Sequence, residues 1–254
     1  MTLTDDELER YARHIVLKEI GGAGQVRLKA AHVAVIGAGG IGAPVLLYLA
    51  AAGVGRLTII DDDTVSRSNL QRQIAFADAD IGASKAHRAA DRVRAINPGV
   101  AVTIHGVRID RAHAANLLAG SHVVVDGSDN FATRLAVADA AYVQRIPLVS
   151  AAIGQFHGQL ATWRGYEPGQ PCYRCYVGDA HDADDCDTCA ELGVLGAMTG
   201  IMGSFAALEA IRALYPFGAD AGGKLHLFDG LAPAMRTIRM PKDPACTTCA
   251  APQG

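Results

Sequence analysis

A glycine-rich segment near residue 40 carries the first chemical signal of the sequence. Residues 37–42 read GAGGIG, which contains the pattern G-x-G-x-x-G between an expected strand and an expected helix. Where side chains are absent, backbone N–H groups can approach phosphate oxygens at the start of a helix. Asp61 ends the next expected strand, where its carboxylate can accept hydrogen bonds from ribose hydroxyls. The spacing predicts a nucleotide-binding site, and the glycine pattern is found most often in dinucleotide-dependent oxidoreductases.

Four polar side chains farther along favour a different use of that nucleotide. Asn69 and Arg72 follow the strand that ends at Asp61, and Lys85 opens the next expected helix. Asp129 follows a later strand. In an open α/β sheet such positions lie at the carboxyl ends of strands, where ligands bind. Two cations and a carboxylate able to hold Mg²⁺ suit phosphoryl or nucleotidyl transfer, whereas hydride transfer does not need them.

The cysteines form a second group with chemical potential. All six lie in the last third of the chain as C-x-x-C pairs: Cys172/Cys175, Cys186/Cys189 and Cys246/Cys249. Two such pairs make a closed tetrahedral zinc site, and three pairs allow three pairings. A thioredoxin-like redox pair is the least supported alternative, because the matching fold context is absent. The spacing alone leaves the pairing open.

The hydrophobic pattern predicts alternating strands and helices around these residues. Apolar, β-branched runs mark expected strands at 32–36, 57–60, 100–105, 122–126 and 148–152. A capping box of Thr4 with Glu7 predicts the start of a first helix, which the glycine-rich segment 21–24 (GGAG) is expected to end. A second helix is expected from the glycine turn to Gly53, and further helices at 85–96, 112–118, 130–144 and 194–214. This alternation is typical of a parallel sheet. After residue 157 the pattern changes, with strands expected at 159–163 and 225–228.

We therefore predict an α/β fold with a Rossmann-like, mostly parallel sheet and helices on both faces. An antiparallel C-terminal extension and a zinc-stapled insertion complete it. No linker-like run divides the 254 residues, which favours a single domain. Within it we expect an N-terminal helical arm (1–30), a nucleotide-binding half (31–155) and a half with zinc knuckles (156–254).

Composition narrows the class of protein. Half of the residues are hydrophobic and the formal net charge is −3, which excludes a disordered chain. The near-neutral charge and 6% aromatic content argue against nucleic acid as the main partner. Residues 33–55 carry no charge, yet their glycines and Pro44 indicate a nucleotide-binding turn rather than a membrane span. The N-terminus lacks the pattern of a secretory signal, so we expect a cytoplasmic protein with no membrane partner.

Taken in order, these motifs make the sequence similar to a known family. They are RYAR at 10–13, the glycine turn, DDDTV at 61–65, SNLQRQ at 68–73, Lys85, Asp129-Asn130, PCYRC at 171–175, CAELGVLG at 189–196, and CTTC at 246–249. The chain resembles, over nearly its whole length, the MoeB/ThiF/HesA family of sulfur-carrier-protein adenylyltransferases, which are relatives of ubiquitin-activating enzymes. It is most similar to members without a rhodanese-like domain.

The resemblance implies roles for individual residues. The implied ATP-binding residues are Gly37, Gly39, Gly40, Gly42, Asp61, Asp63, Ser68, Asn69, Leu70, Gln71, Arg72, Lys85, Asp129 and Asn130. Among them, Arg72, Lys85 and Asp129 would be catalytic, with Asp129 coordinating Mg²⁺. Arg13 would reach the γ-phosphate side from a second subunit, which implies a homodimer. The resemblance also supports Cys172 and Cys175 with Cys246 and Cys249 as the zinc ligands.

The implied reaction is adenylation of a protein. The C-terminal glycine of a small ubiquitin-like carrier ending in Gly-Gly (MoaD/ThiS-like) would attack ATP, on the way to a thiocarboxylate. The second half of the chain would bind this carrier. No rhodanese-like segment follows, so we expect a separate sulfur donor. Cys189 matches a cysteine that is reactive in some members, against the alternative of a packed thiol, whereas Cys186 has no counterpart.

Three other hypotheses stay open on the sequence alone. The first is an NAD-dependent Rossmann oxidoreductase, which nicotinamide binding would reveal. The second is the family's cyclase branch, which adenylates a carboxylate carried on tRNA; the paired terminal knuckles and the near-neutral charge favour the sulfur-carrier branch. The third is a non-catalytic, zinc-stapled binding module, which the joint presence of Arg13, Arg72, Lys85 and Asp129 disfavours.

Overall fold

The computed structural model describes residues 2–178 and 193–250, and an eight-stranded sheet runs through them in the order β3-β2-β1-β4-β5-β6-β7-β8. The strands are β1 (His32–Ile36), β2 (Arg56–Ile60), β3 (Ala101–His105), β4 (Val123–Asp126), β5 (Leu148–Gly154), β6 (His157–Trp163), β7 (Lys224–Asp229) and β8 (Ala234–Arg239). The first five are parallel, and β6, β7 and β8 add to them antiparallel. The predicted fold class is therefore confirmed.

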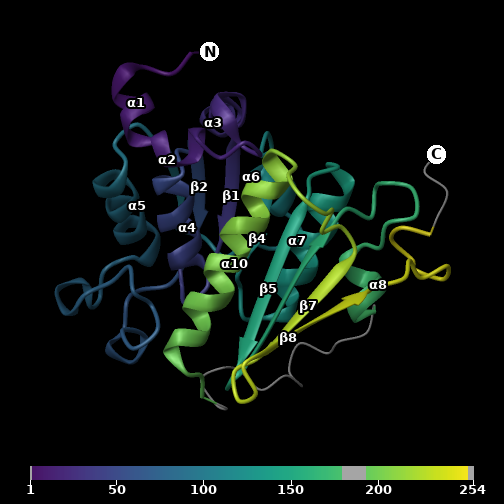
Figure 1. The fold of residues 1–254 in the computed structure, drawn as a ribbon. Helices are drawn as coiled ribbons and strands as arrows, with labels where there is room; N and C mark the ends of the chain where they lie inside the picture. Colours follow the sequence, from purple (N-terminus) through teal and green to yellow (C-terminus); the bar gives the residue numbers. More distant parts are fainter. Residues whose placement is uncertain (1, 179–192, 251–254) are drawn as a thin grey trace.

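Helices cover both faces of the sheet, as Figure 1 shows. Helices α4 (Gly42–Ala51), α5 (Lys85–Ile96) and α10 (Gly196–Leu214) pack into one core, and α6 (Ala114–Leu118) and α7 (Phe131–Val143) into the other. Strand β1 serves both cores because its side chains alternate: Val33 and Val35 join the first, Ala34 and Ile36 the second. β1 is paired on both sides by parallel strands, which explains its uninterrupted apolar run.

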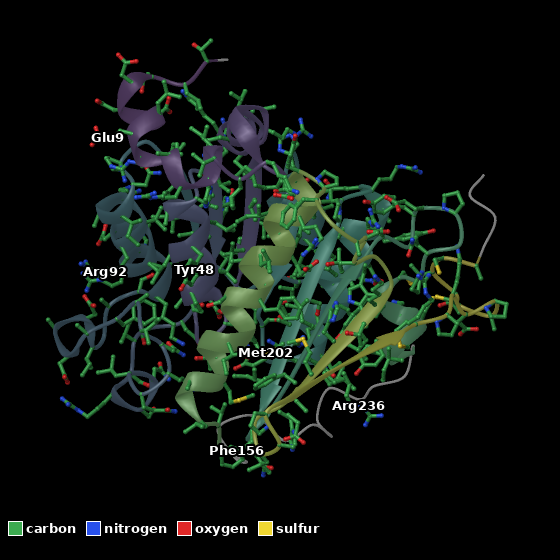
Figure 2. The ribbon with its side chains drawn as sticks, in the orientation of Figure 1. Glu9, Tyr48, Arg92, Phe156, Met202 and Arg236 are labelled. Carbon is green, nitrogen blue, oxygen red and sulfur yellow. The ribbon has the colours of Figure 1, made fainter. Side chains whose placement is uncertain are left out.

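Helix α10 is long and apolar enough to cross a membrane by length and composition alone. In the fold it packs against α4 and β5, and its buried side chains, among them Met202, lie in the core. Figure 2 shows Met202 on α10 beside the sheet. Its hydrophobicity is thus accounted for by the interior of the α/β sandwich.

The N-terminal arm differs from the prediction in one respect. The expected capping box is present, with Thr4 and Glu7 bonded reciprocally at the start of α1 (Asp5–Arg10), and α2 (Ala12–Ile15) follows. However, the glycine-rich segment 21–24 (GGAG) begins a third helix, α3 (Gly21–Ala30), instead of only ending the first. A Cβ on Gly24 would lie 2.9 Å from Ile20 and 3.1 Å from Tyr215, so close packing rather than helix termination accounts for this glycine.

Two elements of the second half were not predicted. Strand β8 forms the outer edge of the sheet, and all its residues are exposed, so it lacks the apolar alternation that marks a strand. The short helix α8 (Tyr173–Val177) begins inside the first C-x-x-C motif and extends two residues past it. The expected boundary at 155/156 falls in the β5–β6 hairpin, inside one continuous sheet, and the division into halves stays a prediction.

Candidate functional site

A cavity of about 600 Å³ opens at the carboxyl ends of the parallel strands. It extends from the ends of β2 and β1, past β4 and β5, to Gln159 on β6 and the tyrosines of α8. These carboxyl ends lie at the lower edge of the sheet in Figure 1, where the arrow of β5 ends. Its place at the crossover between β1 and β4 is where open α/β sheets bind ligands.

The glycine turn is built for close backbone approach. Gly37 has a φ of +81°, which favours glycine, and a Cβ on Gly42 would lie 1.7 Å from the Gly37 carbonyl oxygen. The Asp61 carboxylate holds the turn, because its Oδ2 accepts from the Ala38 N–H at 2.7 Å. Burial raises the pKa of Asp61, against the lowering effect of the Ala38 and Asp63 N–H donors. Gly37, Gly39 and Gly40 line the cavity, leaving their backbone open to an anion.

Two of the predicted cations line the same cavity. The Lys85 side chain is only 7% exposed, and its Nζ lies 2.9 Å from Asp63 Oδ2. Lys85 begins α5 after the cap residue Ser84, so the start of that helix sets its position. Arg72 also lines the cavity, and its Nη1 donates to the Ser68 carbonyl at 3.0 Å. A cavity with two held cations is suited to a polyanionic ligand.

Asp129 and Asn130 also line the cavity, on the loop between β4 and α7. Asn130 caps α7, because its Oδ1 accepts from the Thr133 N–H at 2.9 Å. Arg134 ties this loop to the sheet, since its guanidinium donates to the carbonyl of Ser128 and, at 3.0 Å, to that of Ala151. Arg134 was not predicted from the sequence, although it follows Asn130 by one helical turn.

Other predicted residues lie away from the cavity wall. Gly42 is buried behind the turn, and Arg13 is exposed on α2. Ser68, Asn69, Leu70 and Gln71 form the turn that leads to Arg72, where Asn69 Oδ1 accepts from the Ser66 N–H at 3.2 Å. In this arrangement they support Arg72 from outside the cavity. Cys189, and with it Cys186, lies outside the described residues.

The sulfurs of Cys172, Cys175, Cys246 and Cys249 all lie within 4.8 Å of one another. The pairing that the resemblance supported is therefore the one that the fold brings together. Three of the S···S distances are 3.3, 3.6 and 3.9 Å. Metal–sulfur bonds of about 2.3 Å in tetrahedral geometry put neighbouring sulfurs about 3.8 Å apart, so the cluster fits such an ion. Within the described part of the chain, it alone groups three or more potential metal ligands.

The thiols of this cluster have shifted acidities. Burial raises the pKa of Cys172, and it raises that of Cys249 to about 11. Burial acts in the same direction on Cys246, but the backbone N–H donors of Cys249 and Thr248 outweigh it and lower the pKa. The backbone N–H of Asp243 also lies 3.4 Å from Cys175 Sγ. Because a metal binds thiolates, occupation of this site must release protons.

Fold and site together define an α/β protein with a nucleotide-type cavity at the carboxyl ends of its parallel strands and a four-cysteine cluster that could hold a metal ion. A model described as the ThiF family matches residues 11–248, and the chain belongs to this family. It is 44% identical to a SAMP-activating enzyme E1 of Haloferax volcanii, over 98% of this chain and 92% of that protein. It is 42% identical to a sulfur carrier protein adenylyltransferase of Thermus thermophilus, over 98% and 93%.

A solved structure shares the fold at lower identity. Escherichia coli MccB with MccA-N7isoASN matches with a TM-score of 0.82 at 20% identity, over 94% of this chain and 74% of that one. The fold of this chain is therefore one that a solved structure also has.

Proposed function

We propose that this protein is an ATP-dependent adenylyltransferase that activates the C-terminal glycine of a small ubiquitin-like sulfur carrier. The observation that carries the proposal is the cavity that joins the glycine turn to Arg72, Lys85 and Asp129. Its relatives, at 44% and 42% identity, are named for activating SAMP and for adenylating a sulfur carrier protein. A hydride-transferring oxidoreductase would not need these cations, so that alternative is less well supported.

The proposed chemistry asks mainly for alignment and charge stabilisation. A carboxylate oxygen of the carrier's last glycine attacks the α-phosphorus of ATP, and the bond from that phosphorus to the bridging oxygen breaks. Pyrophosphate leaves with the bonding electrons, and an acyl-adenylate remains. Arg72 and Lys85 would offset the charge on the phosphates, while the glycine turn would hold them by backbone N–H groups. A sulfur nucleophile would later open the adenylate, forming the thiocarboxylate and releasing AMP.

Two metal sites complete the proposal. Mg²⁺ takes oxygen ligands and is often held by one or two carboxylates together with substrate phosphates, which fits Asp129 at the cavity wall. Bound there, it would neutralise phosphate charge. The four-cysteine cluster fits structural Zn²⁺, because it offers four sulfur ligands and no open position. It would join the segment at 172–175 to the segment at 246–249.

The position of Arg13 supports a dimeric site. Arg13 lies on α2, which packs on α3 beside the amino ends of the strands, at the top of Figure 1. The cavity lies at the opposite end of the sheet. Arg13 therefore cannot reach the phosphates of its own subunit without unfolding, whereas a partner subunit could supply it. We propose a homodimer in which Arg13 acts across the interface.

The C-terminal strands offer a surface for a protein substrate. Apolar side chains near the carboxyl edge are exposed, among them Leu231 at 68% and Met235 at 51%. Phe156 lies at the lower tip of the β5–β6 hairpin in Figure 2. Exposed apolar side chains are frequent at docking sites, and we place the carrier there.

ATP–pyrophosphate exchange tests the function directly. Purified protein with Mg²⁺, ATP and a panel of ubiquitin-like carriers ending in Gly-Gly should exchange labelled pyrophosphate with at least one carrier. The same carrier lacking its last two glycines is the matched control and should give no exchange. Exchange absent with every carrier, or tight NAD binding in place of ATP binding, would overturn the proposal. Carrier-independent activity on tRNA would assign the cyclase function instead, and ATP binding with no reaction a non-catalytic module.

A further inference from the structure

The short helix α8 lies between the cysteine cluster and the nucleotide cavity. Cys172 precedes its first residue and Cys175 lies within it, and both belong to the cluster. Tyr173 and Tyr176 line the cavity. Residues three apart share a face of a helix, so one face of this single turn holds the two cysteines and the neighbouring face holds the two tyrosines.

Aromatic contacts hold the two tyrosines against the sheet. The ring of Tyr176 stacks on that of Trp163, with centroids 5.8 Å apart and planes 18° from parallel. Tyr173 meets Trp163 edge-on at 6.0 Å, and Trp163 itself is only 4% exposed. The Tyr176 hydroxyl donates to Gln159 Oε1 at 2.8 Å. These contacts make a rigid wall at one end of the cavity, because no ring can move without breaking a packed neighbour.

The opposite end of the cavity is accounted for by the nucleotide. Phosphates bind at the glycine turn after β1, and the ribose binds at the end of β2. Along the carboxyl edge, β4 follows β1 and carries Asp129, and then come β5 and β6. The part lined by Gln159, Tyr173 and Tyr176 lies beyond Asp129 on this edge and offers space for the group that meets the α-phosphate.

We propose that Tyr176 and Gln159 determine the specificity for the acyl tail, in a position set by the metal at the flanking cysteines. The inference rests on the proposed function and names the part of the same cavity that receives the tail. Tyr176, backed by the buried Trp163, and Gln159 close this end of the cavity, so a side chain on the last residue of the tail would meet packed atoms there, and the wall favours glycine. The metal fixes the wall, because Cys172 and Cys175 carry α8 directly.

The first test distinguishes an effect on binding of the carrier tail from an effect on binding of ATP. Once wild-type exchange is established with a carrier, Tyr176→Ala should raise the KM for that carrier roughly tenfold and leave the KM for ATP unchanged. It should also accept a carrier ending in Gly-Ala that the wild type rejects. Tyr176→Phe keeps the stacked ring and should still reject the Gly-Ala carrier. Tyr176→Phe and Gln159→Leu both remove the hydrogen bond between Tyr176 and Gln159. Equal increases in both KM values, or no gain of the Gly-Ala tail, would disprove the assignment.

The second test follows the packing of the aromatic wall by fluorescence and needs no catalytic turnover. The chain has a single tryptophan, so its emission reports the stacking of Trp163 on α8. Removal of the metal with a chelator should shift that emission, and added Zn²⁺ should restore it. Tyr176→Ala should abolish most of the shift, and Tyr176→Phe should keep it. Metal loss with unchanged emission would show that the cluster does not hold the wall, whatever carrier the protein activates.

Discussion

At the residue scale, the side chains of the site serve two purposes that sequence spacing alone does not separate. Asp61 has the position expected for a ribose contact, yet both of its oxygens already accept backbone N–H groups, from Ala38 and Asp63. It therefore also builds the turn that would cradle the phosphates. Lys85 is likewise held by Asp63, so this cation is oriented before any ligand arrives. Such preorganisation lowers the cost of aligning phosphate charge.

Asp129 offers the clearest residue-scale prediction. Asp129→Ala should reduce pyrophosphate exchange about a hundredfold or more, because the carboxylate that would hold Mg²⁺ is lost. Its thermal midpoint should stay near that of the wild type, since Asp129 lies at the cavity wall and Asn130 still caps α7. Exchange measured over a range of Mg²⁺ concentrations checks this. Asp91→Ala, at an exposed surface pair, is the control, and undiminished exchange by Asp129→Ala would exclude the role.

At the element scale, the N-terminal helix depends on its cap. Thr4→Ala should lower the free energy of unfolding by about 1 kcal/mol, because the Glu7 N–H loses its acceptor at the helix start. Urea unfolding followed by circular dichroism measures the difference. Thr2, which precedes the helix and forms no part of the cap, is the matched site: Thr2→Ala should leave the midpoint unchanged. An unchanged midpoint for Thr4→Ala would show that the cap adds nothing.

Glu7 adds a pH dependence to this element. Its hydrogen bond with Lys29, followed by that with the Thr4 N–H, lowers its pKa below the ordinary 4.5. The contribution of Glu7 to stability is therefore present above pH 4.5 and is lost as the pH falls through the lowered folded-state pKa. In urea unfolding at several pH values, the wild type and Glu7→Gln should thus converge in stability at acidic pH. A difference that persists under acidic conditions would contradict this assignment.

At the scale of the whole molecule, the cysteine cluster joins distant parts of the chain. Cys246→Ser should lose bound zinc and lower the thermal midpoint, because two segments 74 residues apart are no longer tied. Wild-type affinity for zinc should weaken as the pH falls, since the buried thiols must release protons to bind it. Metal analysis and titration at several pH values check both results. Full zinc content in Cys246→Ser would mean that another residue completes the site.

The dimeric site gives a second prediction at this scale. Arg13→Ala and Asp129→Ala should each be inactive alone, whereas coexpression should restore exchange. Half of randomly mixed dimers are heterodimers with one intact site each, so about a quarter of wild-type activity is expected. Coexpressed Asp129→Ala and Lys85→Ala are the control and should recover no exchange, because both residues belong to the cavity of one subunit. No recovery with Arg13→Ala would place Arg13 outside a shared site.

Much of this protein could be predicted from its sequence because its signals are local. A strand buried on both faces shows a continuous apolar run, a capping box needs residues three apart, and a phosphate-binding turn needs glycines at fixed spacing. These features do not depend on distant parts of the chain. The sequence by itself therefore determined the parallel sheet and the glycine turn, and it predicted that Arg72, Lys85 and Asp129 would gather at the carboxyl edge of that sheet.

Tertiary structure decided what depends on residues far apart in the chain. Only the fold brings Cys172 and Cys175 to Cys246 and Cys249, since three C-x-x-C pairs are equivalent in spacing. Only the fold shows that Gly24 is there for packing, that the exposed β8 completes the sheet edge, and that α8 turns two tyrosines into the cavity. Such contacts are set by three-dimensional proximity, which local pattern and propensity do not encode.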